Sequence, residues 1–332
     1  MSLHYYSFRA PRAELNKARY KEVCEREGDA IPLFMQYWWM EAACSGKRWE
    51  AAVAFEEERV VGMMPFLCGR RLAMTYLLQP QLTQYSGPYY FYPEELNAQQ
   101  RLEFEKEVAR LLLSAVETLH PAYIRQQFSP RVTNWLPFYW AGFQQTTRYT
   151  YRLPDIRQPQ LLFETFDKEK RQRKIRRCSQ LTTVRYDLSP EDFALFHKHY
   201  WQRKSGRDLL PTQFIVHVCR TAIKRGNGVI ASLHDAEGNL LMARFVAYDT
   251  QCAYSLLSAI DTERHRSGFN ETLFWALFQY LSDKTIAFDF EGSMDEGIEY
   301  FYRSFGAVQT PYFELTRCRN PLFKLLLKLK RK

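Results

Sequence analysis

Paired cysteines are missing from this sequence. Its seven cysteines are scattered over 332 residues, and no two of them form a Cys-x-x-Cys pair. That pair is the usual sequence sign of a structural zinc site or a dithiol redox centre, so the sequence predicts neither. We expect reduced, mostly buried thiols and no metal site.

Long apolar runs are missing as well. The first residues lack the charged start, apolar core and cleavage site of a secretory signal, and no run is long enough to span a bilayer. We therefore expect a cytoplasmic protein. With 46% hydrophobic and 16% aromatic residues, the chain can bury a large core, and its length predicts two domains.

Net positive charge is confined to two short segments. Residues 168–177 contain seven basic residues and one acidic residue, and residues 317–332 contain seven basic residues and no acidic one. Because the whole chain carries +9, the remainder is net negative. This pattern excludes a protein that coats polyanions generally, DNA included, and predicts local anionic contacts. Residues 168–177 also lack the aromatic side chains of specific RNA readout, so tRNA is only one candidate partner.

A short aromatic pattern occurs twice at a constant offset. Phe138-Tyr139 recurs 163 residues later as Phe301-Tyr302, and Thr147-x-Tyr149 recurs as Thr310-x-Tyr312. A constant offset indicates a duplicated unit. The neighbouring patterns agree, since each half continues from a hairpin to a helix, a short strand, another helix and a closing strand. The hairpins are expected at 49–67 and 228–247, the helices at 102–119 and 271–281, and the short strands at 122–127 and 285–290.

This order resembles the GNAT-type acyltransferase fold. The matching stretches are residues 256–261, 267–275, 288–293 and 301–306, together with the basic Lys174-Ile-Arg-Arg177. They resemble the tandem-GNAT group, which includes Fem-type peptidyltransferases and related acetyltransferase-like proteins. The resemblance implies an α/β (α+β mixed) fold with two GNAT-like domains, each a mixed, mostly antiparallel sheet flanked by helices.

The resemblance also implies how the chain is divided. Residues 1–160 would form the acceptor-side domain, which has no recognisable cofactor motif, and residues 161–318 would form the donor domain. Residues 164–180 would be a basic, helical connector between the halves. Residues 319–332 would form a basic amphipathic tail.

The expected donor site is the start of the helix near residue 270. Coenzyme-A-dependent members carry Gln/Arg-x-x-Gly-x-Gly/Ala there, whereas this chain has His265, Gly268 and Asn270 at the three positions. A glycine and free N–H groups at a helix start still suit an anion. The Ser-Gly-Phe-Asn form looks more like the Fem-type branch, whose donors are aminoacyl-tRNAs, so acyl-CoA and aminoacyl-tRNA both stay open. The candidate cofactor-binding residues are Arg264, Arg266, Ser267, Gly268, Phe269 and Asn270.

Transfer to an amine needs a proton acceptor and a group that protonates the departing atom. On a strand over residues 285–291, Asp289 and Glu291 would share one face. The resemblance assigns Tyr302 as the candidate acid. The structural alternatives are that the two carboxylates cap the next helix or pair with Arg303, and that Tyr302 belongs to the core, as its counterpart Tyr139 could.

Substrate contacts are expected at two further places. Trp201, Lys204 and Arg207 combine aromatic and basic groups that could hold a phosphate or carboxylate, or form a solvated helix end. Tyr85 lies in a loop that resembles an acceptor-side loop of the tandem group, or an ordinary packed turn.

The tail has two interpretations as well. Asn320 and Pro321 suit a helix start, and Leu322, Leu325, Leu326 and Leu329 would share a face. This pattern is typical of a helix on an anionic membrane surface, or of a terminal helix that docks on the protein.

The leading hypothesis is a transferase that moves an acyl or acetyl group from acyl-CoA to an amine. The acceptor, expected in a cleft between the halves, would be an amino sugar or peptide of a peptidoglycan-type cell-envelope precursor, and the tail would allow a peripheral position at the inner face of the cell membrane. One alternative is a Fem-type aminoacyl-tRNA-dependent peptidyltransferase. An alternative of another class is a non-catalytic, degenerate GNAT pair that acts as a binding or membrane-surface adaptor.

Overall fold

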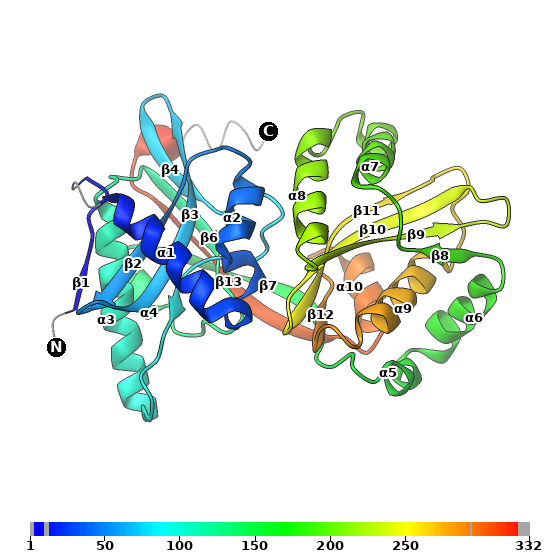
Figure 1. Ribbon diagram of the computed structural model, residues 1–332, viewed down its shortest axis with the longest axis horizontal. Helices are drawn as coiled ribbons and strands as arrows, with labels where there is room; N and C mark the ends of the chain where they lie inside the picture. The colour runs from blue at the N-terminus through cyan, green and yellow to red at the C-terminus, as the bar shows by residue number, and fades with distance from the viewer. Residues whose placement is uncertain (1–2, 10–12, 293, 325–332) are drawn as a thin grey trace. The chain divides into compact units, whose positions relative to one another are not determined.

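The computed structural model describes residues 3–9, 13–292 and 294–324 (Figure 1). Two compact units share the chain: unit 1 comprises residues 1–148 and 311–332, and unit 2 comprises residues 149–310. Both boundaries fall inside strands, β7 (Gln144–Leu153) and β13 (Val308–Cys318). The units therefore differ from the contiguous ranges 1–160 and 161–318 that the sequence predicted.

Unit 1 contains a mixed sheet in the order β1-β2-β3-β4-β6-β13, with β5 paired to β3. All neighbours are antiparallel except β4 and β6, which are parallel. The strands are β1 (Leu3–Tyr5), β2 (Trp49–Glu56), β3 (Arg59–Arg71), β4 (Met74–Leu78), β5 (Tyr89–Tyr90) and β6 (Tyr123–Gln127).

Helices cover both faces of this sheet (Figure 1). The helix α3 (Ala98–Glu117) packs Val108, Leu112 and Val116 on one face, and the other face is covered by α1 (Ala13–Glu27) and α2 (Tyr37–Cys44). A capping box fixes the start of α3, because Asn97 and Gln100 exchange side chain to backbone hydrogen bonds of 2.9 and 3.0 Å. Unit 1 also contains the 3-10 turns Gly28–Ala30 and Leu33–Met35 and the short helix α4 (Leu136–Trp140).

Unit 2 repeats this arrangement with the strand order β7-β12-β11-β10-β9-β8. Only β11 and β12 run parallel. The strands are β8 (Thr183–Arg185), β9 (Gly228–His234), β10 (Leu240–Tyr248), β11 (Cys252–Ile260) and β12 (Ala287–Asp289). Each unit is thus a mixed, mostly antiparallel sheet flanked by helices, as the sequence predicted.

Two groups of helices sandwich the sheet of unit 2 (Figure 1). On one face, α7 (Pro190–Ser205) contacts β11 and α8 (Thr212–Lys224) contacts β9. On the other face lie α9 (Phe269–Leu281) and α10 (Glu296–Arg303), whose phenylalanines form an aromatic core with the sheet. The basic connector is helical, as expected, and forms α5 (Pro159–Thr165), the π-helix Lys168–Gln172 and α6 (Arg173–Ser179).

The last strand of each unit comes from the other half of the sequence. In unit 1, β13 pairs with β6, with Leu315 opposite Gln126. In unit 2, β7 pairs with β12, with Arg152 opposite Asp289. The expected boundaries assumed that each half closes its own sheet, and this exchange is the reason they differ from the two units.

The segment after β13 begins to form the predicted tail helix over residues 321–324, and residues 325–332 lie outside the described part of the chain. Phe323 is buried and stacks on Tyr123 at a ring separation of 5.5 Å. Within the described ranges, no helix combines the length and the apolar character needed to cross a membrane.

Candidate functional site

The strand that carries the candidate carboxylates is shorter than the sequence predicted. It ends at Asp289, because Glu291 and Gly292 adopt left-handed φ values of 61° and 29°. A side chain at Gly292 would lie 2.2 Å from the carbonyl oxygen of Tyr149, so the turn requires glycine there. Glu291 therefore lies two residues beyond the end of the strand, where the simple alternation of faces no longer applies.

Asp289 is fully buried and held on three sides. Its Oδ1 accepts hydrogen bonds from Thr150 Oγ1 at 2.5 Å and from the backbone N–H of Glu291 at 2.8 Å. Its Oδ2 lies 3.6 Å from Nε of Arg152. Burial lowers the pKa of Arg152, but its interactions with Cys252 and Asp289 outweigh burial and raise that pKa overall. Asp289 therefore faces a permanent cation.

Glu291 has a different environment. Its Oε1 is buried and has no hydrogen-bond partner among the described residues. Burial raises the pKa of Glu291 well above its ordinary value, and the negative charge of Asp289 adds to the effect. A carboxyl group of this kind keeps its proton to a higher pH than an exposed glutamate does.

Tyr302, on α10, stacks on Phe290 with 4.6 Å between ring centroids. Burial raises the pKa of Tyr302, the charge of Arg244 lowers it, and the charges of Glu291 and Asp289 raise it further. Phe290 lies between Asp289 and Glu291 in the sequence, so Tyr302 packs against the segment that carries both candidate carboxyl groups.

The specific structural alternatives for the carboxylates do not hold. The N-cap of α10 is Asp295, whose Oδ1 accepts a hydrogen bond of 3.1 Å from the N–H of Ile298. Arg303 pairs with Glu299 at 2.8 Å. Neither Asp289 nor Glu291 has the capping or pairing role that the sequence left open.

Arg244 is a member of this group that the sequence analysis missed. It is buried on β10, and it donates to Ser255 Oγ at 2.6 Å and to Asn270 Oδ1 at 3.1 Å. Burial lowers the pKa of Arg244 to about 10, and Tyr302 opposes that effect. The guanidinium also lies 4.0 Å from the ring centre of Phe274. A buried arginine held by neutral groups supplies positive potential beside Tyr302.

The start of α9 is occupied by a carboxylate. Glu271, in its first turn, is buried, and its Oε1 accepts hydrogen bonds from Arg171 Nη1 at 2.8 Å and Lys174 Nζ at 3.3 Å. A negative charge here already uses the favourable potential of the helix start. A diphosphate of coenzyme A placed at the same turn would have to compete with this carboxylate for the helix start and for its two cations.

The six candidate cofactor residues have diverse environments. Gly268 faces the connector, since a Cβ there would lie 3.2 Å from Cys178 and 3.3 Å from the carbonyl oxygen of Lys174. Phe269 is part of the core, and Asn270 binds Arg244. Arg264 pairs with Asp261 at 3.1 Å, while Arg266 and Ser267 are exposed. Only Asn270 is linked to the carboxylate and tyrosine group.

The expected substrate residues lie elsewhere. Lys204, near the end of α7, donates to the Tyr200 hydroxyl at 3.1 Å and lies 4.9 Å from the ring centre of Trp201. Arg207 is exposed just beyond the C-cap of α7. In unit 1, Tyr85 is buried and packs edge-on against Tyr312 at 5.2 Å. Their substrate roles stay predictions.

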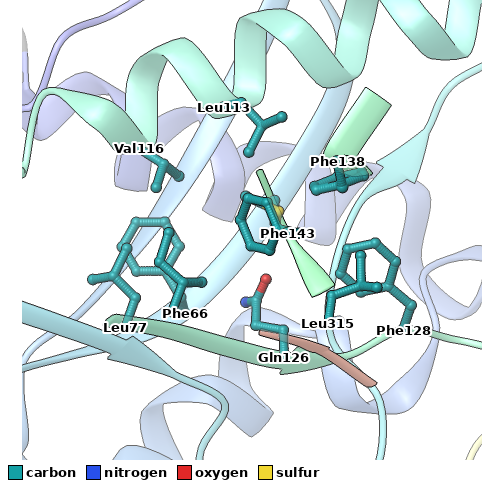
Figure 2. A pocket seen from close by; sticks show the side chains of 11 residues that line it. Phe66, Leu77, Leu113, Val116, Gln126, Phe128, Phe138, Phe143 and Leu315 are labelled. Carbon is teal, nitrogen blue, oxygen red and sulfur yellow. The ribbon is translucent and has the colours of Figure 1, made fainter. Parts of the chain in front are cut away.

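The equivalent place in unit 1 lacks the carboxylates. At the offset of 163 residues, Gln126 corresponds to Asp289 and Phe128 to Glu291, in agreement with the matching strand registers. Figure 2 shows Gln126 surrounded by apolar side chains, including Phe128 and Phe138. They leave a cavity of about 10 Å³. Unit 2 alone has acid–base groups at this position.

No cluster of three histidine, cysteine or acidic side chains suited to a metal ion occurs among the residues that the structure describes. The seven cysteines are free thiols, six of them buried.

Comparisons with known proteins identify the fold. Residues 168–301 match the family model of the acetyltransferase (GNAT) domain. The structure of FemX has a TM-score of 0.68 at 13% identity and covers 94% of this chain and 97% of its own. The C-terminal domain of a putative lysylphosphatidylglycerol synthetase from Agrobacterium fabrum has a TM-score of 0.57 at 12% identity, with 94% and 96% covered. A tandem GNAT protein from the clavulanic acid biosynthesis pathway has a TM-score of 0.54 at 10% identity, with 96% and 99% covered.

None of the curated proteins compared with this chain matches it. Residues 168–301 thus match a GNAT domain model, and the similarity to these solved structures shows the tandem GNAT fold that the sequence predicted. Fold alone does not define a substrate, which depends on the residues of the site.

Proposed function

We propose that this chain transfers an acyl group to an amine, with the chemistry in unit 2. The observation that carries the proposal is the buried, coupled group of Asp289, Glu291 and Tyr302, in which the pKa of Glu291 is raised well above its ordinary value. Such groups are typical of acid–base sites.

Each residue has a role in this proposal. The neutral amine attacks the acyl carbonyl carbon, the new C–N bond forms, and the ionised form of Glu291 accepts the proton that the nitrogen loses. Tyr302 donates its proton to the departing atom as the old acyl bond breaks. Asp289 keeps its charge against Arg152 and raises the proton affinity of Glu291.

Arg244 completes the group as a positioning residue. Its charge lowers the pKa of Tyr302 and so favours proton release to the leaving atom. Its hydrogen bonds to Ser255 and Asn270 fix β10 relative to β11 and α9.

For the donor, we favour aminoacyl-tRNA over acyl-CoA. The support is Glu271, whose carboxylate lies in the first turn of α9, paired with Arg171 and Lys174. A diphosphate at that turn would have to displace Glu271 from the helix start and from its two cations. The acceptor would be an amine of a cell-envelope precursor, and we further propose that the protein acts in the cytoplasm.

Thermal unfolding with separate donors tests this choice. We expect the purified chain to gain several degrees in Tm with charged tRNA, less with the same tRNA uncharged, and nothing with acetyl-CoA. A gain with acetyl-CoA and none with charged tRNA would restore acyl-CoA as the donor. If neither ligand raises Tm and no donor supports transfer to an amine, the non-catalytic adaptor is the better description.

A further inference from the structure

A basic hollow of about 550 Å³ lies at one end of unit 1. Segments that are distant in sequence line it: the chain after β1, the hairpin of β3 and β4, the turn before β6 and the segment after β13. Figure 1 shows that hairpin and the short C-terminal helix at the same end of unit 1. Of the described residues that line the hollow, Arg9, Arg70, Arg319 and His120 carry basic groups and none is acidic.

Much of this positive charge is available to a ligand. Arg319 pairs with Glu117, so its charge is partly neutralised. Arg9 and Arg70 are exposed, and neither forms an ion pair with a carboxylate in the described part of the chain. Two guanidinium groups at one hollow suit the phosphodiester oxygens of an anionic ligand.

The tip of the hairpin beside the hollow carries an unusual turn residue. Arg71 pairs with Met74, so Leu72 and Ala73 form a two-residue loop, and their φ values are 47° and 61°. Asn-Gly and Asp-Gly are the preferred sequences for such a loop, because left-handed φ is unfavourable for a leucine. Leu72 is nevertheless 67% exposed. The chain thus places an apolar side chain in water at a position that disfavours it.

A second exposed leucine directly follows two residues that line the hollow. Asn320 and Pro321 line it, and Leu322, the next residue, is 53% exposed. The turn that carries Leu322 is fixed to unit 1, because Phe323 is buried against Tyr123 and its N–H donates to Asn320 Oδ1 at 3.2 Å. Beyond Lys324, the sequence of residues 325–332 contains four further basic residues and no acidic one.

We propose that this hollow and its two flanking leucines form a docking surface for an anionic lipid bilayer. Arg9 and Arg70 would bind headgroup phosphates, and Leu72 and Leu322 would enter the boundary between headgroups and acyl chains. The surface belongs to unit 1 and does not depend on the proposed reaction.

A nucleic acid is a poorer fit to the same surface. Binding of single-stranded nucleic acid uses aromatic side chains that are free to stack on bases. The aromatic residues near the hollow contact one another instead, since Phe323 packs on Tyr123 at 5.5 Å and on Tyr76 at 6.0 Å. The exposed apolar groups are aliphatic, which favours lipid.

Sedimentation of the full chain with vesicles tests the proposal. We expect binding to phosphatidylcholine vesicles that contain phosphatidylglycerol, little binding to phosphatidylcholine alone, and weaker binding as salt is raised. The double variant Arg9→Gln/Arg70→Gln removes two charges, each worth roughly 1 kcal/mol near such a surface, so affinity should fall by about 10- to 30-fold. Arg185→Gln, an exposed arginine on β8, is the matched control and should leave binding unchanged.

A second double variant tests the role of Leu72 in vesicle binding. Leu72→Asn/Ala73→Gly gives the turn its preferred sequence, so we expect a higher Tm together with a loss of vesicle binding on the order of tenfold. This opposite movement separates lipid docking from a structural role of Leu72. Leu181→Asn, at an exposed leucine of unit 2, is the control for a change in surface polarity alone.

Three results would overturn the proposal. The first is that both double variants bind the anionic vesicles as the wild type does. The second is equal binding of the wild type to vesicles with and without phosphatidylglycerol. The third is that the same variants retain vesicle binding but lose retention of tRNA in a gel-shift assay, which would make the hollow an RNA surface.

Discussion

Arg152 lies opposite Asp289 in the ladder of β7 and β12, with 3.6 Å between Nε and Oδ2. The neighbouring carboxyl group of Glu291 has no such cation, and its Oε1 has no hydrogen-bond partner among the described residues. Two carboxyl groups that are two residues apart in the sequence therefore have different electrostatic environments. In such a pair one carboxyl group, here Asp289, is suited to stay ionised, and the other, here Glu291, is suited to transfer a proton.

Glu291→Gln removes the proposed proton acceptor and keeps the size of the side chain. We expect kcat to fall by roughly 10²- to 10⁴-fold, the usual contribution of a positioned acid or base. The measurement is single-turnover transfer with a saturating donor. Full activity in this variant would exclude Glu291 from the chemistry.

The same substitution should change how stability depends on pH. The folded-state pKa of Glu291 is raised by burial and by Asp289, so the folded protein binds its proton more tightly than the unfolded chain does. Its contribution is present below the unfolded pKa of about 4.3 and is lost as pH rises through the folded pKa. Urea unfolding should therefore show Glu291→Gln to be more stable than wild type at pH 8, with the difference vanishing in acid.

Tyr302→Phe removes the hydroxyl and keeps the ring that stacks on Phe290. We expect a loss of about 10²- to 10⁴-fold in kcat with Tm nearly unchanged, because only the proton donor is lost. Tyr139→Phe is the matched control at the equivalent position of unit 1, where the side chain is 58% exposed. Equal kcat values for the two variants would show that Tyr302 only packs in the core and does not donate the proton.

Glu271→Gln should destabilise the fold. Its partner Arg171 is buried, with a side-chain exposure of 5%, and would lose its only carboxylate within ion-pair distance in the described structure. Breaking a buried pair in this way typically costs about 3–5 kcal/mol, and the retained amide oxygen places the expectation near the lower value. Glu169→Gln disrupts a pair with Arg173 that is almost fully exposed, so its effect should stay below about 0.5 kcal/mol. Comparable denaturation midpoints for both variants would contradict this account.

Leu113→Ala enlarges the apolar cavity of unit 1 that Figure 2 shows. A loss of about 2–5 kcal/mol is expected for a buried leucine beside an existing void, measured by urea unfolding. Leu102→Ala, on the same helix but 55% exposed, should change stability by less than about 0.5 kcal/mol. Activity per folded molecule should be kept in both variants, because the proposed chemistry belongs to unit 2.

The elements that the sequence analysis predicted correctly are those that local sequence patterns determine. The hairpins and the helices α3 and α9 were predictable because alternation, turn residues and helical spacing act over a few residues. The strand over 285–291 was predicted too long, since the left-handed backbone at Glu291 and Gly292 depends on the close approach of Tyr149. That approach is invisible in the sequence.

Partners from distant segments could not be predicted. Thr150 and Arg152 reach Asp289 only because β7 joins the second sheet, and the repeat alone predicted the opposite pairing. Arg244 did leave a signal, as the single charge within the otherwise apolar residues 240–247. Burying a charged side chain is costly, so a lone charged residue in an otherwise apolar strand is a sequence sign of a functional site, as a pair of carboxylates is.

The exchange of closing strands also decides how the two units are encoded. The sheet of unit 1 includes residues on both sides of unit 2 in the sequence, because Glu314–Cys318 pair with β6. A single cut in the chain therefore cannot separate the two sheets with all of their strands.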